Sequence, residues 1–314
     1  MRLVFMGTPA FAVPTLERLC ASGPEVLAVY TQPDRPKGRG GALAQSPVKE
    51  AAVRLGLRVE QPERVRHPEV VAALAELGLD VIVIVGYGQI IPQTILDLPK
   101  HGIINVHASL LPKYRGAAPI QWAIANGETV TGVITMRIDA GLDTGTMLLK
   151  RETAIREDES ALELGARLSL FGADLSIETL ASIESGAIRP ESQDSTQASY
   201  APILKKEDGR IDWNLPARAI ANRARGFLPW PGTYSTFRGQ LLHVWKARAA
   251  ADRNFGGVAG ELHADGKKLF AHCGNDSAVE LIEVQLEGRK RVTAEAFLNG
   301  HAVRREEILG AEAV

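Results

Sequence analysis

Short runs of apolar residues alternate with amphipathic segments along the first half of the chain. This pattern predicts strands at residues 3–6, 26–31, 80–85, 103–107, 130–138 and 146–150, and helices at residues 10–20, 46–55, 70–76, 118–126 and 160–184, with another helix starting at Pro92. The clearest strand covers residues 81–85, which are continuously apolar and β-branched, as is typical of a parallel strand covered on both faces. The strand–helix–strand opening therefore predicts an α/β fold with a mostly parallel sheet.

The pattern changes after residue 186. Pro, Ser, Gln, Thr and Asp replace the apolar periodicity over residues 187–206, which predicts a linker. Beyond it, glycine-punctuated β-like runs at residues 233–237, 241–245, 260–262, 269–273 and 279–284 predict a small barrel. A helix is expected at residues 217–226, and it carries Arg218, Arg223 and Arg225. The sequence thus predicts one domain at residues 1–186, a linker at 187–206 and a second domain at 207–314.

The composition narrows the class of protein. A chain of 314 residues with 45% hydrophobic and 23% charged residues is typical of a folded globular protein with room for two domains. Its net charge of −1 gives no overall attraction to nucleic acid or membrane, so any basic surface must be local. Cys20 and Cys273 lack metal-ligand spacing, the amino terminus lacks a signal-peptide core, and no apolar run approaches membrane-spanning length. A cytoplasmic protein with no metal and no membrane segment is expected.

Two polar residues interrupt the predicted strand at 103–107. Asn105 and His107 are two positions apart, so their side chains point to the same side of the strand. They approach its carboxyl end, where open α/β sheets bind their ligands. Two leucines and Pro112 follow in a loop and suggest one wall of an apolar slot. A structural histidine and a turn asparagine remain the alternative, and these residues alone support the two interpretations about equally.

The segment at 32–41 is rich in glycine and proline and carries Arg35, Lys37 and Arg39 against one acid. Neither a strand nor a helix is expected there. A basic loop at the end of a strand is placed to meet a phosphate backbone, although a solvated surface loop explains the same residues at least as well. The first strand-to-helix turn keeps only Gly7 of the Gly-x-Gly-x-x-Gly fingerprint, which argues against a dinucleotide site.

A third candidate residue, Asp143, lies in a glycine-flanked loop. A carboxylate near an imidazole favours the protonated ring and fixes its orientation. An amide N–H and an imidazolium can together stabilise a developing oxyanion. Because no Ser or Cys is placed as a nucleophile, acyl transfer from a bound donor to an incoming amine fits these groups best. A turn-capping role for Asp143 is equally open on these grounds.

The candidate residues belong to motifs that resemble those of folate-dependent formyltransferases. The central motifs are NVHASLLP at residues 105–112 and LDTG at residues 142–145. Flanking motifs narrow the resemblance to the methionyl-tRNA formyltransferase family: QPDRP at 32–36, YRGAAPIQW at 114–122, KEDGRIDW at 206–213 and PWP at 229–231. The motifs occur in order over nearly the whole chain.

The resemblance implies a Rossmann-like amino-terminal domain that binds 10-formyltetrahydrofolate, and a smaller OB-like β-barrel that helps hold initiator methionyl-tRNA. The implied reaction formylates the methionyl amino group and gives N-formylmethionyl-tRNA for translation initiation. Matched by motif, the catalytic residues are Asn105, His107 and Asp143, the folate-binding residues are Ser109, Leu110, Leu111 and Pro112, and the tRNA-binding residues are Arg35, Lys37 and Arg39. A cytoplasmic monomer is expected.

Two departures and two rival functions accompany this interpretation. The family's basic loop is often followed by lysines, whereas Gly41 and Ala42 stand there in this chain. Ala108 stands where the motif commonly has Gly, and its methyl group should be tolerated unless φ is positive. A formyltransferase acting on a small amine, such as a purine precursor or an amino-sugar nucleotide, would share the same three residues but often lack the second domain. A dinucleotide-binding oxidoreductase or a non-catalytic binding module is the rival from another class, and the missing glycine fingerprint argues against nucleotide binding.

Overall fold

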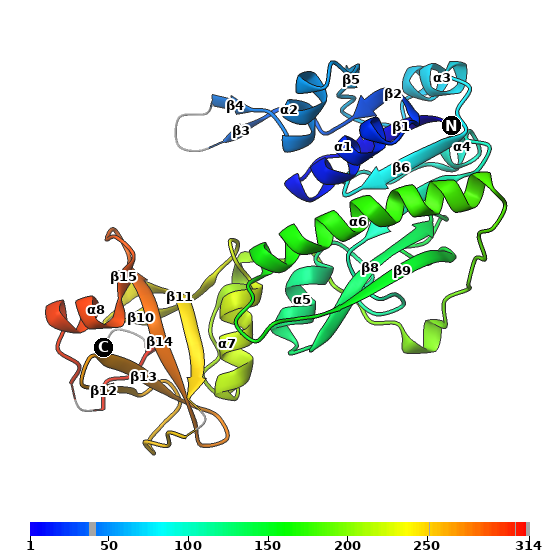
Figure 1. Cartoon of the computed structure of the whole chain (residues 1–314). Coiled ribbons are helices and arrows are strands. Elements are labelled where there is room, and N and C mark those ends of the chain that lie inside the picture. The colour runs from blue at the N-terminus through cyan, green and yellow to red at the C-terminus, as the bar shows by residue number, and fades with distance from the viewer. Residues whose placement is uncertain (38–41, 251, 305, 312–314) are drawn as a thin grey trace. The chain divides into compact units, whose positions relative to one another are not determined.

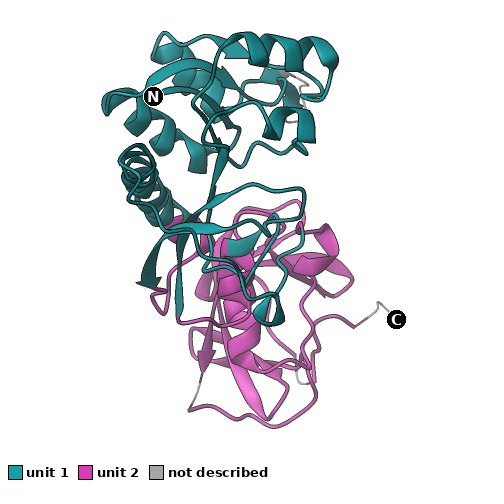
Figure 2. Ribbon diagram, turned by 90° about the vertical axis from the view of Figure 1, so that its right-hand side faces the viewer, with its two compact units in different colours: residues 1–119, 130–153, 165–202 teal, residues 120–129, 154–164, 203–314 magenta. Residues whose placement is uncertain are grey.

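The computed structural model describes residues 1–37, 42–250, 252–304 and 306–311 (Figure 1). The chain divides into two compact units, which Figure 2 colours separately. Unit 1 comprises residues 1–119, 130–153 and 165–202, and unit 2 comprises residues 120–129, 154–164 and 203–314.

Unit 1 is built on a seven-stranded sheet with the order β5-β2-β1-β6-β7-β8-β9. Its strands are β1 (Arg2–Gly7), β2 (Glu25–Tyr30), β5 (Val59–Glu60), β6 (Val81–Val85), β7 (Ile103–His107), β8 (Val130–Arg137) and β9 (Met147–Ala154). The first five in spatial order pair in parallel, and β8 runs antiparallel to β7. The predicted mostly parallel α/β sheet is therefore confirmed.

The helices of unit 1 also follow the predicted pattern, except for η2, which lies within the predicted linker. They are η1 (Ala10–Ala12), α1 (Val13–Ala21), α2 (Pro47–Arg54), α3 (Pro68–Glu76), α4 (Gln93–Leu96), the larger part of α6 (Ala161–Glu184) and η2 (Ser195–Gln197). Helix α2 starts where it does because the Ser46 hydroxyl accepts the Lys49 N–H at 3.0 Å and Pro47 needs no backbone partner at the first position. All five residues of β6 are buried, as a parallel strand covered on both faces requires.

The basic segment after β2 contains a short hairpin. Strand β3 (Arg35–Lys37) pairs antiparallel with β4 (Ala42–Ala44). The prediction that no strand forms over residues 32–41 is therefore wrong for β3. Only three backbone pairings are needed, and Pro36 is tolerated because a two-stranded sheet consists of edge strands. Arg39, the best-matched residue of the predicted tRNA loop, lies outside the described residues.

Residues 187–202, within the predicted linker, pair with other parts of unit 1. Glu191 and Met147 exchange two backbone hydrogen bonds of 2.8 Å. Further along, the Arg115 N–H donates to the Ser199 carbonyl at 2.9 Å, and the Ala201 N–H donates to the Arg115 carbonyl at 2.7 Å. This part of the chain is fixed by backbone pairing despite its lack of apolar periodicity.

Unit 2 contains a six-stranded antiparallel sheet in which the path β10-β11-β14-β13-β12 is joined by β15, paired with β14. Its strands are β10 (Thr233–Phe237), β11 (Gln240–Ala250), β12 (Leu262–Asp265), β13 (Lys268–Cys273), β14 (Ser277–Leu286) and β15 (Val292–Thr293). The helices are α5 (Pro119–Ala125), η3 (Lys206–Gly209), α7 (Ala217–Gly226) and α8 (Ala294–Gly300). The sequence predicted α5 and α7 but not α8.

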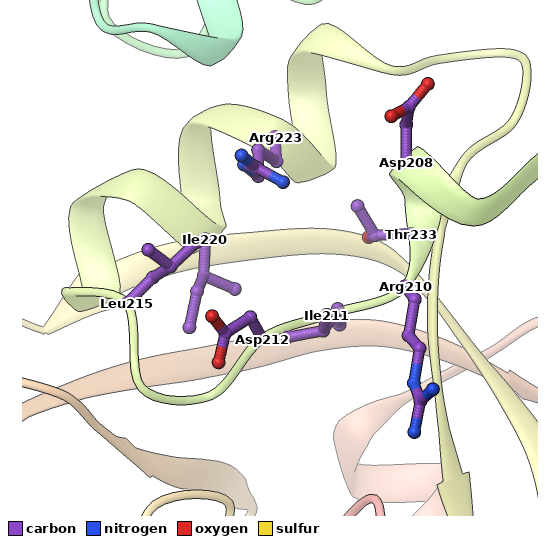
Figure 3. A pocket seen from close by; sticks show the side chains of 8 residues that line it. All are labelled: Asp208, Arg210, Ile211, Asp212, Leu215, Ile220, Arg223 and Thr233. Atoms are coloured by element: carbon purple, nitrogen blue, oxygen red, sulfur yellow. The ribbon is translucent and has the colours of Figure 1, made fainter. Parts of the chain in front are cut away.

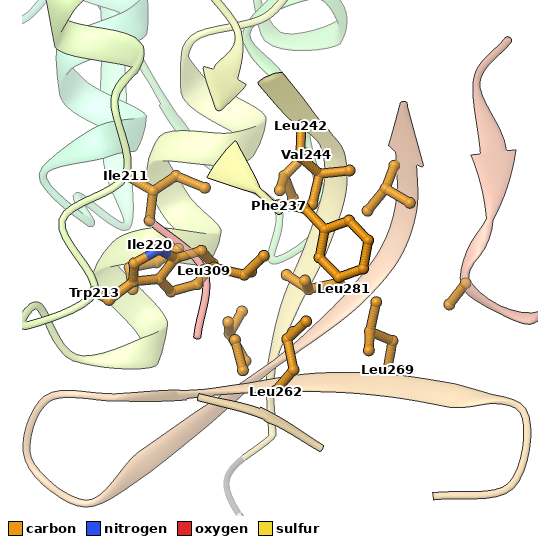
Figure 4. Packing of buried hydrophobic residues seen from close by; sticks show 14 of the residues in the cluster. Ile211, Trp213, Ile220, Phe237, Leu242, Val244, Leu262, Leu269, Leu281 and Leu309 are labelled. Atoms are coloured by element: carbon orange, nitrogen blue, oxygen red, sulfur yellow. The ribbon is translucent and has the colours of Figure 1, made fainter. Parts of the chain in front are cut away.

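The core of unit 2 lies where this sheet meets α7 and α8. Phe237, Trp213 and Leu309 point into the same cluster from distant parts of the chain (Figure 4). The Trp213 indole N–H donates to the Ser235 hydroxyl at 3.0 Å, which satisfies the polar atom of a buried aromatic ring.

The carboxyl-terminal segment bridges the two ends of this strand path. The Leu262 N–H donates to the Glu307 carbonyl at 2.7 Å, and the Leu309 N–H donates to the Gly260 carbonyl at 2.8 Å, both beside β12. The Gly310 N–H donates to the Thr236 carbonyl of β10 at 2.9 Å. Residues 307–311, named here the closing segment, thus pair with both edges, which gives the sheet the barrel-like closure expected of the second domain.

Residues 120–129 and 154–164 belong to unit 2 because they contact α7 and the residue that follows it. The rings of Trp122 in α5 and Phe227 after α7 meet edge to face with centroids 5.3 Å apart. The Arg225 guanidinium donates to the Glu159 carbonyl at 2.8 Å. Burial lowers the pKa of Arg225 from its ordinary value, so this arginine of α7 serves internal packing.

Candidate active site

Strand β7 places Asn105 and His107 in the middle of the unit 1 sheet. Asn105 pairs with Ile84 of β6 and Met136 of β8. His107 is paired with Ile134 of β8 and is the last residue of the strand. Because β7 has neighbours on both sides, its backbone is held, and the two polar side chains leave the same face of the strand as predicted.

The His107 ring is buried and is hydrogen-bonded through Nε2. Its Nε2 lies 2.9 Å from the Tyr114 carbonyl oxygen, and only 5% of the residue is exposed. Since a carbonyl can only accept, Nε2 carries the proton in this contact. Tyr114 has a φ of 61°, a conformation that costs a bulky residue free energy and that aims its carbonyl at the ring.

Asp143 faces the other ring nitrogen. Its Oδ2 lies 3.7 Å from His107 Nδ1, within ion-pair range but longer than a hydrogen bond. The same oxygen accepts the Gly116 N–H at 2.8 Å. Asp143 adopts a φ of 51°, which a short polar residue tolerates better than most. The structure therefore brings together two of the predicted residues that are far apart in the chain.

The loop that carries Asp143 is stabilised from within. The Asp139 carboxylate accepts the Gly141 N–H at 3.0 Å and the Thr144 hydroxyl at 2.7 Å. Gly145 allows close backbone contact, because a Cβ there would collide with the Arg137 carbonyl oxygen. These contacts limit the positions that the Asp143 side chain can take.

The loop after β7 contains both buried and half-buried residues. The Ser109 hydroxyl, fully buried, donates to the Lys113 carbonyl at 2.7 Å. Leu111 packs with Ile134 and Met136 in a small core cluster. Leu110 and Pro112 are half-buried, so among these four residues they retain surface for an apolar ligand. Ala108 is not among the residues with positive φ, which explains why its methyl group is tolerated.

Two further residues, which no pattern in the sequence indicates as functional, support the Asp143 loop. Gln193 donates from Nε2 to the carbonyls of Asp143 and Gly145, both at 2.8 Å. Its Oε1 accepts from Arg115 Nη2 at 2.8 Å and from Nε at 3.0 Å. No local pattern indicates such a contact, because Gln193 lies in a stretch without apolar periodicity and reaches a loop some fifty residues earlier.

The basic hairpin places Arg35 on the surface. The neighbouring Asp34 is paired with Lys49 at 2.6 Å, and hydrogen bonds from Lys49 and Gln61 lower the pKa of its carboxyl group. Its negative charge is thus matched by a partner and does not cancel that of Arg35. A pocket of about 290 Å³ beside the hairpin is lined by Gln32, Pro33, Arg35, Glu63 and Arg64.

A narrow crevice in unit 2 carries mixed charge. It lies between α7 and the segment before β10 (Figure 3) and is lined by Asp208, Arg210, Ile211, Asp212, Leu215, Ile220, Arg223 and Thr233. Its lining holds no histidine, and the Thr233 hydroxyl donates to the Val244 carbonyl at 2.8 Å, so these residues do not suggest a reaction centre.

The described part of the chain has neither a metal-binding cluster nor a membrane-spanning helix. Within it, no group of three or more His, Cys, Asp or Glu side chains is arranged to hold a metal ion. Within the same residues, no helix has both the length and the apolar character needed to cross a membrane.

Comparison with known proteins identifies the protein family of this chain. Residues 1–180 match the family described as formyl transferase, and residues 203–302 match the family described as formyl transferase, C-terminal domain. A protein of Solibacter usitatus named methionyl-tRNA formyltransferase is 61% identical over 99% of both chains, and one of the same name from Koribacter versatilis is 53% identical over 99% of both. The chain belongs to the methionyl-tRNA formyltransferase family.

Solved structures agree on the fold. A sugar 3N-formyl transferase crystallised with dTDP and 5-N-formyl-THF aligns with a TM-score of 0.68 at 17% identity, covering 92% of this chain and 99% of that one. An N-formyltransferase from Helicobacter canadensis aligns with a TM-score of 0.66 at 18% identity, covering 89% and 98%. These similarities concern the fold alone.

Proposed function

We propose that this chain transfers the formyl group of 10-formyltetrahydrofolate to the free amino group of the methionyl moiety on initiator methionyl-tRNA. The product, N-formylmethionyl-tRNA, serves translation initiation. The observation that carries the proposal is 61% identity to a methionyl-tRNA formyltransferase over 99% of both chains. The pairing of His107 with Asp143 at the end of β7 supports it, since formyl transfer to an amine needs charge stabilisation and proton transfer rather than a protein nucleophile.

In the proposed reaction the methionyl nitrogen attacks the formyl carbon, and a tetrahedral oxyanion forms. The Asn105 amide and the His107 ring stabilise that negative charge. As the intermediate collapses, the new amide bond remains, the bond from carbon to N10 of the folate breaks, and N10 takes up a proton while the amine loses one. Tetrahydrofolate and the formylated tRNA are the products.

The hydrogen bonds around His107 suggest how the proton moves. Because Nε2 donates to the Tyr114 carbonyl, Nδ1 is the ring nitrogen available for exchange. The Asp143 carboxylate, 3.7 Å from Nδ1, stabilises the ring when it is protonated and keeps it oriented. In this proposal Asp143 tunes His107 and helps to pass the proton from the attacking amine.

The two substrates are proposed to meet different surfaces of unit 1. We assign the folate to the loop Ser109, Leu110, Leu111 and Pro112, in which Leu110 and Pro112 supply the apolar surface. We assign the phosphates of the tRNA acceptor end to Arg35, Lys37 and Arg39, supported by the exposure of Arg35. We further propose a cytoplasmic monomer. Both cysteines are free, which is consistent with a reducing compartment.

The test is a transfer assay with the full chain, charged initiator tRNA and 10-formyltetrahydrofolate, following N-formylmethionyl product after ester hydrolysis. Product is expected with methionyl-tRNA and not with free methionine. Parallel reactions with an amino-sugar nucleotide test the rival. Turnover of the sugar with none of the tRNA would replace the proposal.

A further inference from the structure

We infer that Gln193 and Arg115 are positioning residues that hold Asp143 in the orientation it needs opposite His107. The inference rests on the proposed function, because it concerns the same site. It assigns a role to the segment at 193–201, which lies outside the motifs that identify the family.

The orientation of the Gln193 amide is determined by its partners. Arg115 can only donate hydrogen bonds, so the atom 2.8 Å from its Nη2 must be the amide oxygen. The carbonyls of Asp143 and Gly145 can only accept, so the nitrogen must face them. All these contacts agree on one orientation, and Gln193 therefore joins Arg115 to the Asp143 turn.

These hydrogen bonds of Gln193 are important because the backbone of the Asp143 turn is strained. Asp143 adopts a φ of 51°, a left-handed conformation that is unfavourable for a residue other than glycine, even though Asp tolerates it better than most. Each carbonyl on either side of Thr144 is held by the same Gln193 nitrogen at 2.8 Å. If the turn relaxed to negative φ, the carbonyls would rotate away from this nitrogen, so the two bonds favour the strained conformation.

Arg115 supports Asp143 a second time through the backbone. Its side chain holds Gln193, and the N–H of the next residue, Gly116, donates to Asp143 Oδ2 at 2.8 Å. Arg115 itself is only 3% exposed, and its backbone is paired with Ser199 and Ala201. The Asp143 backbone and carboxylate are thus tied to one short, buried stretch, which fixes the carboxylate relative to the imidazole.

The consequence is kinetic. Neither Gln193 nor Arg115 is proposed to touch a substrate, so their loss should slow the chemical step without weakening binding. A small displacement of a group that acts in the transition state can cost up to about 100-fold in rate. Removal of Gln193 is expected to lower kcat about 10- to 100-fold while KM for both substrates stays within about twofold.

The test compares Gln193→Ala with Gln197→Ala in the full chain. Gln197 lies in the same segment, is exposed, and bonds only Asp194 in the contacts described, at 2.8 Å. Gln193→Glu is the geometric variant, because it can still accept from Arg115 but cannot donate to the two carbonyls. Both Gln193 variants should lose kcat, and Gln197→Ala should match the parent chain. Circular dichroism melting curves accompany each variant.

A double-mutant cycle separates positioning from general stabilisation. If Gln193 acts through Asp143, adding Gln193→Ala to Asp143→Asn should reduce kcat by less than twofold more. Independent, multiplying effects would overturn the inference, and so would unchanged kcat in Gln193→Ala. A parent chain that forms no formylated tRNA would instead count against the proposed function, so the two failures are distinguishable.

Discussion

His107 lies between two acceptors, one in the loop that follows β7 and one in the loop that carries Asp143. The Tyr114 carbonyl lies 2.9 Å from Nε2 and the Asp143 carboxylate 3.7 Å from Nδ1. An imidazole between two acceptors is suited to carry a second proton briefly, which is what a group assisting amine attack must do. The contribution of the pair is therefore expected to appear in turnover rather than in substrate binding.

Replacement of either member tests this directly. His107→Ala and Asp143→Asn are each expected to lower kcat about 10²- to 10⁴-fold, as loss of acid–base or oxyanion groups does. Steady-state formylation of charged initiator tRNA is the measurement. His101→Ala, at a half-buried histidine just before β7, is the control and should stay near the parent rate. Near-normal turnover of both site variants would remove the proposed catalytic pair.

The turn at Gly116 tests whether local backbone geometry supports this pair. Gly116 has a φ of 118°, and a Cβ there would lie 2.7 Å from the Ala201 carbonyl oxygen. Gly116→Ala is therefore expected to lose about 1–3 kcal/mol of unfolding free energy and to lower kcat, because the displaced N–H holds Asp143. Gly102→Ala is the matched control, since its φ is 78° and nothing lies within 4 Å of its Cβ position. Urea unfolding and steady-state kinetics of both variants measure the two effects. Equal losses of kcat in the two variants would contradict the prediction.

The β3–β4 hairpin is the element on which tRNA binding is proposed to depend. Arg35 is exposed, and its neighbour Asp34 is occupied by Lys49. Arg35→Ala and Arg39→Ala should weaken tRNA binding and reduce the slope of log affinity against log salt by about one each. Filter binding over a salt series is the measurement. Arg189→Ala serves as control, because that exposed arginine contacts backbone carbonyls of its own turn. An unchanged slope would mean that the hairpin does not contact phosphate.

Helices and strands that are determined by neighbouring residues could be predicted from the sequence. The apolar run of β6 and the capped helix α2 depend on neighbouring residues, and both appear where expected. Helix α8 was missed because it is short and directly follows the β-like Val292 and Thr293. Strand β4 consists of Ala42–Ala44, whose composition has low β-propensity, so the hairpin is determined by pairing rather than by residue type.

The candidate active site was partly predictable from the sequence, because some of its residues belong to local patterns. Strand alternation placed Asn105 and His107 on one face, and the family motif indicated Asp143. Gln193 could not be found this way, because a side-chain hydrogen bond to a loop fifty residues away leaves no periodic trace. Arg115 stands within a recognised motif, but its burial and its partner follow only from the folded chain.

The closing segment links the end of the chain to the stability of the entire second unit. It pairs with β12 and β10, and Leu309 is 2% exposed within the core cluster. Leu309→Ala is expected to lower the free energy of unfolding by about 2–4 kcal/mol, since it removes a buried side chain and leaves a cavity. Its neighbour Ile308 is 37% exposed, so Ile308→Ala should cost less than about 1 kcal/mol. Urea unfolding of the full chain measures both. Equal losses in the two variants would mean that the segment contributes only its backbone pairing and that its side chains do not complete the core.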